Sequence, residues 1–265
     1  MRTHLVSYAT KNFRHSQKIL AKSAIDHDID VVWSCTRGQL VTTGFYRANR
    51  KVLDAERGSG YWLWKPYWLN QIMGALEDGD LLVYSDAGIR ITGNLSPLFE
   101  LCVNNGGILL FHAHYDDIGV PGPCINRRWT KRDCFKRMDC DSPKYWDAKH
   151  VDASFQIYQK TPGAAKFLKE YLSFCLDPLI LTDCPNEAGT ENLPEFVAHR
   201  EDQSVLSLLS IKYALEIFRH PSQYGNHFKL PAYRIPGEAL AKPYASTPYK
   251  NSPYGTLLNH HRTRT

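Results

Sequence analysis

The 265-residue sequence lacks any apolar run that approaches the roughly 20 residues needed for a membrane-spanning helix. Its opening residues, MRTHLVSYAT, contain neither a long apolar stretch nor a small-residue cleavage site, so we predict no signal peptide. Internal repeats and linker-like stretches are missing as well. The sequence therefore predicts one domain over 1–265 with no transmembrane segment.

The sequence also lacks a C-x-x-C pair, the spacing on which zinc ribbons are built. It holds seven cysteines, and an odd number at this length does not indicate a disulfide framework. Reduced thiols are typical of the cytosol, so we expect a cytoplasmic protein.

Positively charged residues are in small excess. The formal net charge of +5 suits an anionic small ligand, but it is too weak to indicate a nucleic-acid partner unless it is focused. One cluster, RRWTKR at 127–132, does interleave positive charge with an aromatic ring. It could bind phosphate or nucleic acid, or it could be a solvated basic face.

What the sequence does contain is an alternation of strand and helix patterns. The run 81–84 is apolar at every position, which is typical of a strand buried on both faces in a parallel sheet covered by helices. We expect an α/β fold with a central, mostly parallel sheet flanked by helices. The expected strands are 4–10, 30–36, 81–84, 107–112, 153–159 and 214–219, and the expected helices are 13–25, 66–77, 130–138, 163–176 and 202–209. The Pro- and Tyr-rich segment 221–265 is expected to be an irregular C-terminal wrap.

Asp86 stands where that apolar run stops, in the stretch GDLLVYSDAG. In open α/β sheets, ligands bind beyond the carboxyl ends of the strands. Asp86 could therefore hold a ribose hydroxyl or a divalent metal, and Gly88 would let a ligand approach the backbone closely. The alternative is that these residues only form a turn.

A second group of polar residues, HREDQS at 199–204, lies at the start of an expected helix. Glu201, Asp202 and Gln203 could hydrogen-bond a sugar-like polyol, and one of the carboxylates could act as a general base. The alternative is an acidic helix start that complements the helix dipole.

Two histidine motifs are further candidates. His112, His114 and Asp116 share one face if HAHYDD continues a strand, which would suit zinc or iron, although such histidines are often only hydrogen-bonded. The terminal NHHR, 259–262, could fold back and bind metal or diphosphate, or it could be a frayed tail.

Together, these motifs resemble glycosyltransferases of the GT-A type, in particular small bacterial and viral glycosyltransferase-like proteins of surface polysaccharide loci. The resemblance implies a single GT-A-like (Rossmann-like) domain. It also implies transfer of a sugar from a nucleotide diphosphate sugar, most often UDP-linked, to a glycan or another hydroxyl acceptor in surface polysaccharide synthesis. The motifs that carry it are GYWLWKPY (60–67), GDLLVYSDAG (79–88), WTKRD (129–133), ASFQIY (153–158), HREDQSVLSLL (199–209) and NHHR (259–262).

The resemblance also assigns roles to residues. It implies Asp202 as the base, with Glu201 beside it, and leaves inverting or retaining stereochemistry open. The donor-binding residues would be Trp64, Lys65, Ser85, Asp86, Gly88, Arg132, Asp133 and Gln203.

The metal is a separate question. In the GT-A family an Asp-x-Asp motif holds Mg²⁺ or Mn²⁺, and here Asp86 matches the first acid while Gly88 stands in place of the second. Asp86 with His260 or His261 would be the remaining metal ligands. Otherwise cationic side chains must neutralise the leaving diphosphate, and the candidates are Lys65, Arg128, Lys131 and Arg132.

Two other functions remain open. The missing second acid and the aromatic group 61–64 would also fit a carbohydrate- or nucleotide-binding module without catalysis. A metal hydrolase centred on His112, His114 and Asp116 is the third alternative.

Overall fold

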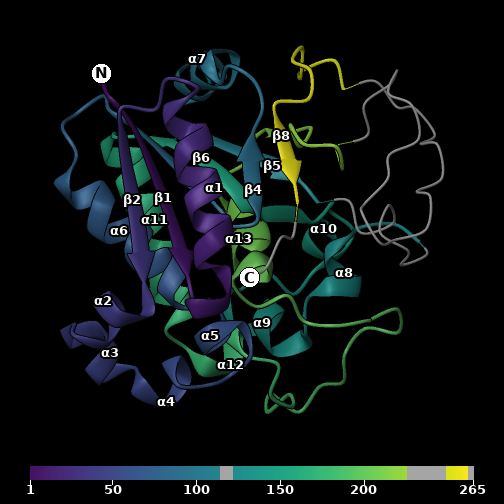
Figure 1. The fold of residues 1–265 in the computed structure, drawn as a ribbon. Coiled ribbons are helices and arrows are strands. Elements are labelled where there is room, and N and C mark those ends of the chain that lie inside the picture. Colours follow the sequence, from purple (N-terminus) through teal and green to yellow (C-terminus); the bar gives the residue numbers. More distant parts are fainter. Residues whose placement is uncertain (114–121, 226–248, 262–265) are drawn as a thin grey trace.

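The computed structural model describes residues 1–113, 122–225 and 249–261. Its centre is a six-stranded sheet with the order β2-β1-β3-β6-β5-β7 (Figure 1). Of these strands, β6 runs antiparallel to both neighbours and the other five are parallel to one another, so the expected mostly parallel α/β sheet is confirmed. The strands are β1 (Thr3–Ala9), β2 (Val31–Thr36), β3 (Leu81–Ser85), β5 (Ile108–His112), β6 (Val151–Gln159) and β7 (Ile217–Phe218).

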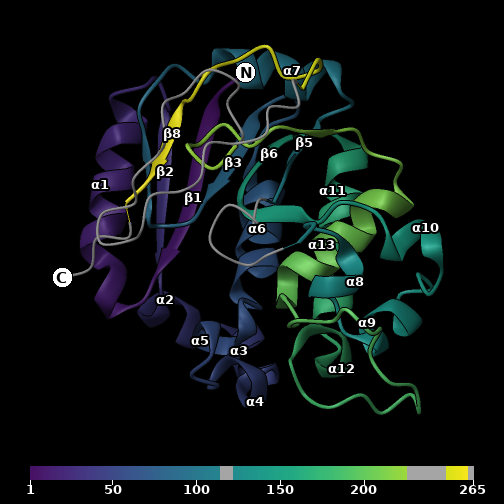
Figure 2. The same ribbon diagram turned by 90° about the vertical axis from the view of Figure 1, so that its right-hand side faces the viewer.

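Helices cover both faces of this sheet (Figure 2). The longer helices are α1 (Arg14–Ile25), α6 (Trp64–Ala75), α7 (Ser96–Asn104), α11 (Pro162–Cys175) and α13 (Glu201–Lys212). Side chains of β3 alternate between the two faces: Leu81 and Val83 pack with α1 and α7, whereas Leu82 and Tyr84 pack with α6, α11 and α13. Within the described ranges, no helix is both long and apolar enough to cross a membrane.

Short helices fill the connections. The predicted helix 130–138 is α9, which begins only at Arg132, because Thr130 and Lys131 both have an extended backbone and Lys131, not Thr130, is its N-cap. The predicted strand 214–219 shrinks to β7, since Ala214 has a positive φ of 51° and turns the chain just before it. The short elements are η1 (Lys11–Phe13), α2 (Arg37–Val41), α3 (Gly44–Ala48), α4 (Arg50–Leu53), α5 (Gly58–Tyr61), α8 (Asn126–Trp129), α9 (Arg132–Arg137), α10 (Pro143–Trp146) and α12 (Pro178–Leu181).

A second, two-stranded sheet ties the C-terminal segment to the loop after β3. Strand β4 (Ile89–Ile91) pairs antiparallel with β8 (Leu258–His260), and the His261 N–H donates to the Gly88 carbonyl at 3.0 Å. The segment from residue 221 was expected to be irregular, so β8 is a correction. Strand pairs this short carry little local signal and depend on contacts between residues far apart in sequence.

The antiparallel direction of β6 determines which of its residues lie at the edge of the sheet where the parallel strands end. Ser85, the last residue of β3, pairs with Phe155 near the start of β6, and His112 at the end of β5 pairs with Val151. The first residues of β6 therefore lie at the same edge as the carboxyl ends of the parallel strands.

Candidate functional site

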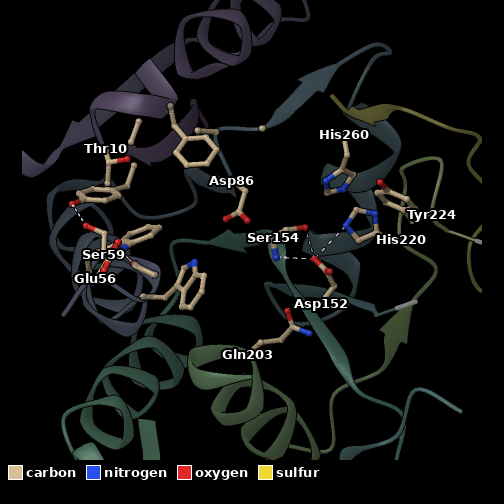
Figure 3. A pocket seen from close by; sticks show the side chains of 18 of the residues that line it. Thr10, Glu56, Ser59, Asp86, Asp152, Ser154, Gln203, His220, Tyr224 and His260 are labelled. Carbon is tan, nitrogen blue, oxygen red and sulfur yellow. Dashed lines mark hydrogen bonds and ion pairs between the residues drawn. The ribbon is translucent and has the colours of Figure 1, made fainter. Parts of the chain in front are cut away.

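A pocket of about 630 Å³ opens at this edge, and Asp86 lies in its middle (Figure 3). One side, which we call the aromatic end, is formed by Tyr8, Phe13, Trp62 and Trp64, with the hydroxyls of Thr10 and Ser59. The opposite side, which we call the ionisable end, is formed by His112, Asp152, Ser154, His220, Tyr224 and His260. The pocket thus offers flat apolar surfaces on one side and charged or hydrogen-bonding groups on the other.

The aromatic end is ordered by ring stacking and by an unusual backbone. The rings of Tyr8 and Trp64 are stacked with centroids 4.1 Å apart, and the Trp64 indole N–H donates to the Gly58 carbonyl at 2.9 Å. All residues from 58 to 62 have positive φ, between 51° and 102°. Glycine is required at 60, because a Cβ there would lie 2.6 Å from the Cα of Leu53. This left-handed run places Ser59 and Trp62 on the pocket wall, and such backbone strain is frequent at functional sites.

Asp86 is held from three directions. Its backbone N–H donates to the Ser154 carbonyl at 2.8 Å, and the Tyr84 hydroxyl donates to its Oδ1 at 2.5 Å. The Nζ of Lys65 lies 3.9 Å from the same Oδ1. Because 39% of the side chain is exposed, the carboxylate remains open to a ligand in the pocket.

Beneath Asp86, Lys65 forms a buried ion pair with Asp202. The Lys65 Nζ lies 2.8 Å from the Asp202 Oδ2, which also accepts a hydrogen bond from the Tyr171 hydroxyl at 2.9 Å. Burial lowers the pKa of the Lys65 ammonium, but attraction to Asp202 and Asp86 outweighs it, so the pKa is raised and the ammonium stays charged. Neither Lys65 nor Asp202 lines the pocket, and the pair lies under its floor.

Glu201 is likewise turned away from the pocket. It pairs with the Arg57 Nε at 2.5 Å and its side chain is 4% exposed. Burial raises the pKa of its carboxyl to about 7, although Arg57 opposes this shift. Its φ of 44° marks a strained start of α13.

The structure brings some predicted site residues to the pocket and not others. Those that line it are Trp64, Asp86, Gly88, Gln203 and His260. Ser85 is fully buried, and its hydroxyl donates to the Asp86 carbonyl at 3.2 Å.

The predicted donor-binding residues Arg132 and Asp133 lie elsewhere, at the start of α9. The Asp133 carboxylate accepts hydrogen bonds from the backbone N–H groups of Glu187 and Ala188, at 2.7 and 3.1 Å. Arg132 pairs with Asp141 at 2.9 Å. The Asp133 contacts order the loop after α12, and neither Arg132 nor Asp133 lines the pocket. Lys131 and Arg128 do not line this pocket either.

Asp152 and His220 are pocket residues that we did not predict. Asp152 is the second residue of β6, where its Oδ1 accepts hydrogen bonds from the backbone N–H and the hydroxyl of Ser154, at 2.7 and 2.5 Å. The His220 Nε2 lies 3.4 Å from the same oxygen. A signal was present, because Asp152 is an acid directly before an apolar strand. Asp152 was missed because the first residues of a strand lie at the carboxyl ends of the parallel strands only if that strand runs antiparallel to them.

The residues that could hold a divalent metal do not form a complete set of ligands. Asp86 and His260 both line the pocket, but within the described part of the chain no group of three or more His, Cys, Asp or Glu side chains is placed to hold an ion. Asp86 Oδ1 is already bonded to Tyr84, and His261 contacts Gly88 through its backbone. The chain's own described residues therefore do not fit a resident Mn²⁺ or Mg²⁺. Of the alternative histidine site, His112 lines the pocket, and His114 and Asp116 lie outside the described residues.

No protein-family model and no curated protein matches the sequence. Similar solved structures include mouse xyloside xylosyltransferase 1 in its apo form, with 12% identity, a TM-score of 0.47, and coverage of 98% of this chain and 97% of that one. The galactosyltransferase LgtC in complex with donor and acceptor sugar analogs has 11% identity, a TM-score of 0.41, and coverage of 98% and 87%. The apo bifunctional glycosyltransferase WbbM has 12% identity and a TM-score of 0.45, with coverage of 78% of this chain but 37% of WbbM. Likeness at this level does not establish a shared activity, which must be argued from the site.

Proposed function

We propose that this protein is a glycosyltransferase that moves a sugar from a nucleotide diphosphate sugar to a hydroxyl group of an acceptor. The observation that carries the proposal is the pocket itself. It lies at the carboxyl edge of a mostly parallel sheet, where such sheets bind ligands, and Asp86 separates two chemically different ends. A nucleotide sugar has the same division, with a flat base at one end and a polyol at the other.

The aromatic end suits the nucleoside. Tyr8, Phe13 and Trp64 present ring surfaces against which a base can stack, and base stacking on an aromatic side chain contributes about 1–3 kcal/mol. Thr10 and Ser59 add hydroxyls at the same end. The exposed carboxylate of Asp86 is then in place to accept hydrogen bonds from the ribose.

The ionisable end suits the sugar, and the negative diphosphate would lie between the two ends. Lys65 stays charged directly beneath Asp86, and the His260 ring lies on the pocket wall where it could donate to the diphosphate. We propose that Asp202 acts by holding Lys65 in place, since its Oδ2 is occupied by Lys65 and Tyr171. Gln203, which does line the pocket, is the residue of that helix start that we expect to touch the sugar.

The donor, the transferred sugar and the acceptor are also part of the proposal. The sequence resemblance supports a UDP-linked donor, a hexosyl or pentosyl group, and a glycan acceptor in surface polysaccharide synthesis. Seven free cysteines fit an enzyme of the reducing cytoplasm.

Turnover tests the proposal. The protein is incubated with a panel of UDP-, GDP- and CMP-linked sugars and hydroxyl acceptors, with and without Mn²⁺, and the released nucleotide and the glycosylated product are measured by mass spectrometry. We expect one donor class to be consumed, and Asp86→Asn to reduce that consumption. Binding of a nucleotide sugar with no turnover on any acceptor would favour the non-catalytic binding module instead.

A further inference from the structure

We propose that Asp152 is a catalytic residue of this site, which receives the acceptor hydroxyl and takes its proton as the new glycosidic bond forms. The inference rests on the proposed glycosyl transfer and adds to it the general base and the place of the acceptor. The acceptor would enter at the ionisable end, next to His220 and His260 (Figure 3).

The two oxygens of the Asp152 carboxylate are in different situations. Oδ1 accepts from the Ser154 N–H at 2.7 Å and from the Ser154 hydroxyl at 2.5 Å, and it faces the His220 Nε2 at 3.4 Å. Among the described residues, no hydrogen bond or ion pair goes to Oδ2. The carboxylate is thus fixed through one oxygen, and the other is left for a ligand in the pocket that Asp152 lines.

His220 is suited to hold Asp152, not to act as the base itself. Its Nδ1 accepts a hydrogen bond from the Ser222 N–H at 3.2 Å, which leaves Nε2, the atom that faces Asp152, to carry a ring proton. The side chain is 3% exposed, and the ring packs edge-on against Phe111 with centroids 5.7 Å apart. With one nitrogen bonded and the other turned to Asp152, His220 is a positioning residue.

The other acids near the pocket are less suited to the task. Asp86 uses Oδ1 for Tyr84 and faces Lys65, whereas Glu56 is exposed and lies at the aromatic end. Glu201 and Asp202 are buried in ion pairs below the pocket. Asp152 is therefore the acid at the ionisable end that combines a fixed orientation with an available oxygen.

The charges around Asp152 keep its carboxylate ionised. Burial raises the pKa of Asp152, but His220, the hydrogen bonds from Ser154 and the more distant His260 outweigh it, so the pKa lies well below its usual range. Asp86 and Asp202 face it with like charge, while Lys65 lies on the same side with opposite charge. The ionised carboxylate can accept the proton that the acceptor hydroxyl gives up as its oxygen bonds to the anomeric carbon.

The step balances without another reactant. The acceptor oxygen forms a bond to the anomeric carbon, and the bond from that carbon to the diphosphate oxygen breaks. The diphosphate leaves with the electron pair, and the hydroxyl proton passes to Asp152 Oδ2. A single displacement of this kind inverts the anomeric configuration.

The experiment compares Asp152→Asn and Asp152→Glu with wild type and with the matched control Asp26→Asn, an exposed acid at the end of α1. UDP affinity is measured by calorimetry, and folding is checked by thermal unfolding. The kcat of each variant is measured with the donor that the turnover panel identifies. We expect Asp152→Asn to lower kcat by about 100-fold or more while UDP affinity changes less than about threefold. Asp152→Glu, which keeps a carboxylate, should retain more kcat than Asp152→Asn and covers the case in which Asn fails to fold.

The other outcomes separate the two proposals. A wild-type protein that binds no nucleotide diphosphate overturns the proposed function and this inference with it. UDP binding and turnover in wild type, with kcat of a folded Asp152→Asn within about tenfold, overturn only the role of Asp152. His220→Gln, which keeps an N–H donor, should retain more kcat than His220→Phe, and equal losses in both would overturn the positioning role.

Discussion

The side-chain nitrogen of Lys65 lies 2.8 Å from a carboxylate oxygen of Asp202, with both side chains at most 5% exposed. This pair connects α6, which presents Lys65, to the first turn of α13, and it lies beneath Asp86 at the end of β3. A charge buried this deeply is stable only with its partner, so the floor of the pocket depends on both residues.

Removing one partner should therefore cost much more than removing both. Lys65→Met leaves Asp202 buried without its counter-charge, and we expect it to lower the free energy of unfolding by about 3–5 kcal/mol. Asp202→Leu should have a similar cost. Denaturant unfolding of both single variants and of the double variant measures the coupling, and the double variant should lose clearly less than the sum. Strictly additive losses would show that the two charges do not depend on each other.

The left-handed backbone at 58–62 leads to a second prediction, about the effect of substituting Gly60 on the free energy of unfolding. Gly60→Ala places a Cβ at 2.6 Å from the backbone of Leu53 at a φ of 102°, so we expect a loss of about 3 kcal/mol from strain and overpacking. Gly74→Ala is the matched control, because a Cβ there meets no atom within 4 Å and the residue lies inside α6. It should be neutral or stabilise the protein by up to about 1 kcal/mol. Thermal unfolding that shows equal effects for the two variants would contradict the conformation assigned to this loop.

The raised pKa of the Glu201 carboxyl should make the free energy of unfolding depend on pH. Its pKa is raised from 4.5 to about 7, so between these values the folded protein holds a proton that the unfolded chain has released. The contribution of Glu201 to the free energy of unfolding therefore falls as the pH rises from 4.5 to about 7, by at most about 1.4 kcal/mol per pH unit. Glu201→Gln cannot titrate but still accepts a hydrogen bond from Arg57, so its stability relative to wild type should increase from pH 5 to pH 7.5.

Chemical unfolding of wild type, Glu201→Gln and the exposed control Glu100→Gln across that range checks this. A stability difference between wild type and Glu201→Gln that stays constant with pH, or that changes in the opposite direction, would contradict the assignment.

Gly88 offers a test of the incomplete metal site. Its backbone is not in the left-handed region, and a Cβ there would meet no atom within 4 Å, so a side chain fits. Gly88→Asp adds a second carboxylate two residues after Asp86, and we expect Mn²⁺ to bind at least about tenfold more tightly in the presence of UDP than it does to wild type. Gly88→Asn is the uncharged control. Calorimetry that finds the same Mn²⁺ affinity in wild type and Gly88→Asp would show that the second acid is not what limits the metal.

The parts of the fold that could be predicted are those with strong local patterns. The uninterrupted apolar run 81–84 correctly indicated the buried strand β3, and the amphipathic pattern at 163–176 correctly indicated α11. The pairing of β4 with β8 could not be predicted, because it joins residues about 170 positions apart and neither strand is longer than three residues.

The site was predictable only in part for a related reason. Asp86 was found because it follows an obvious strand, but Asp152 and His220 reach it through the antiparallel direction of β6 and the short strand β7. Arg132 and Asp133 look functional in sequence because they are charged and start a helix. In the structure, the same charges satisfy the backbone of a long loop and a neighbouring acid.

Calorimetric titration of UDP into wild type and Asp86→Asn tests the central claim most directly. Asparagine keeps the shape of the side chain and removes the charge that should accept the ribose hydrogen bonds. We predict that wild type binds UDP and that Asp86→Asn, folded as judged by thermal unfolding, binds it at least about tenfold more weakly. Absence of binding to any nucleoside diphosphate, or equal affinity in the two proteins, would contradict the account.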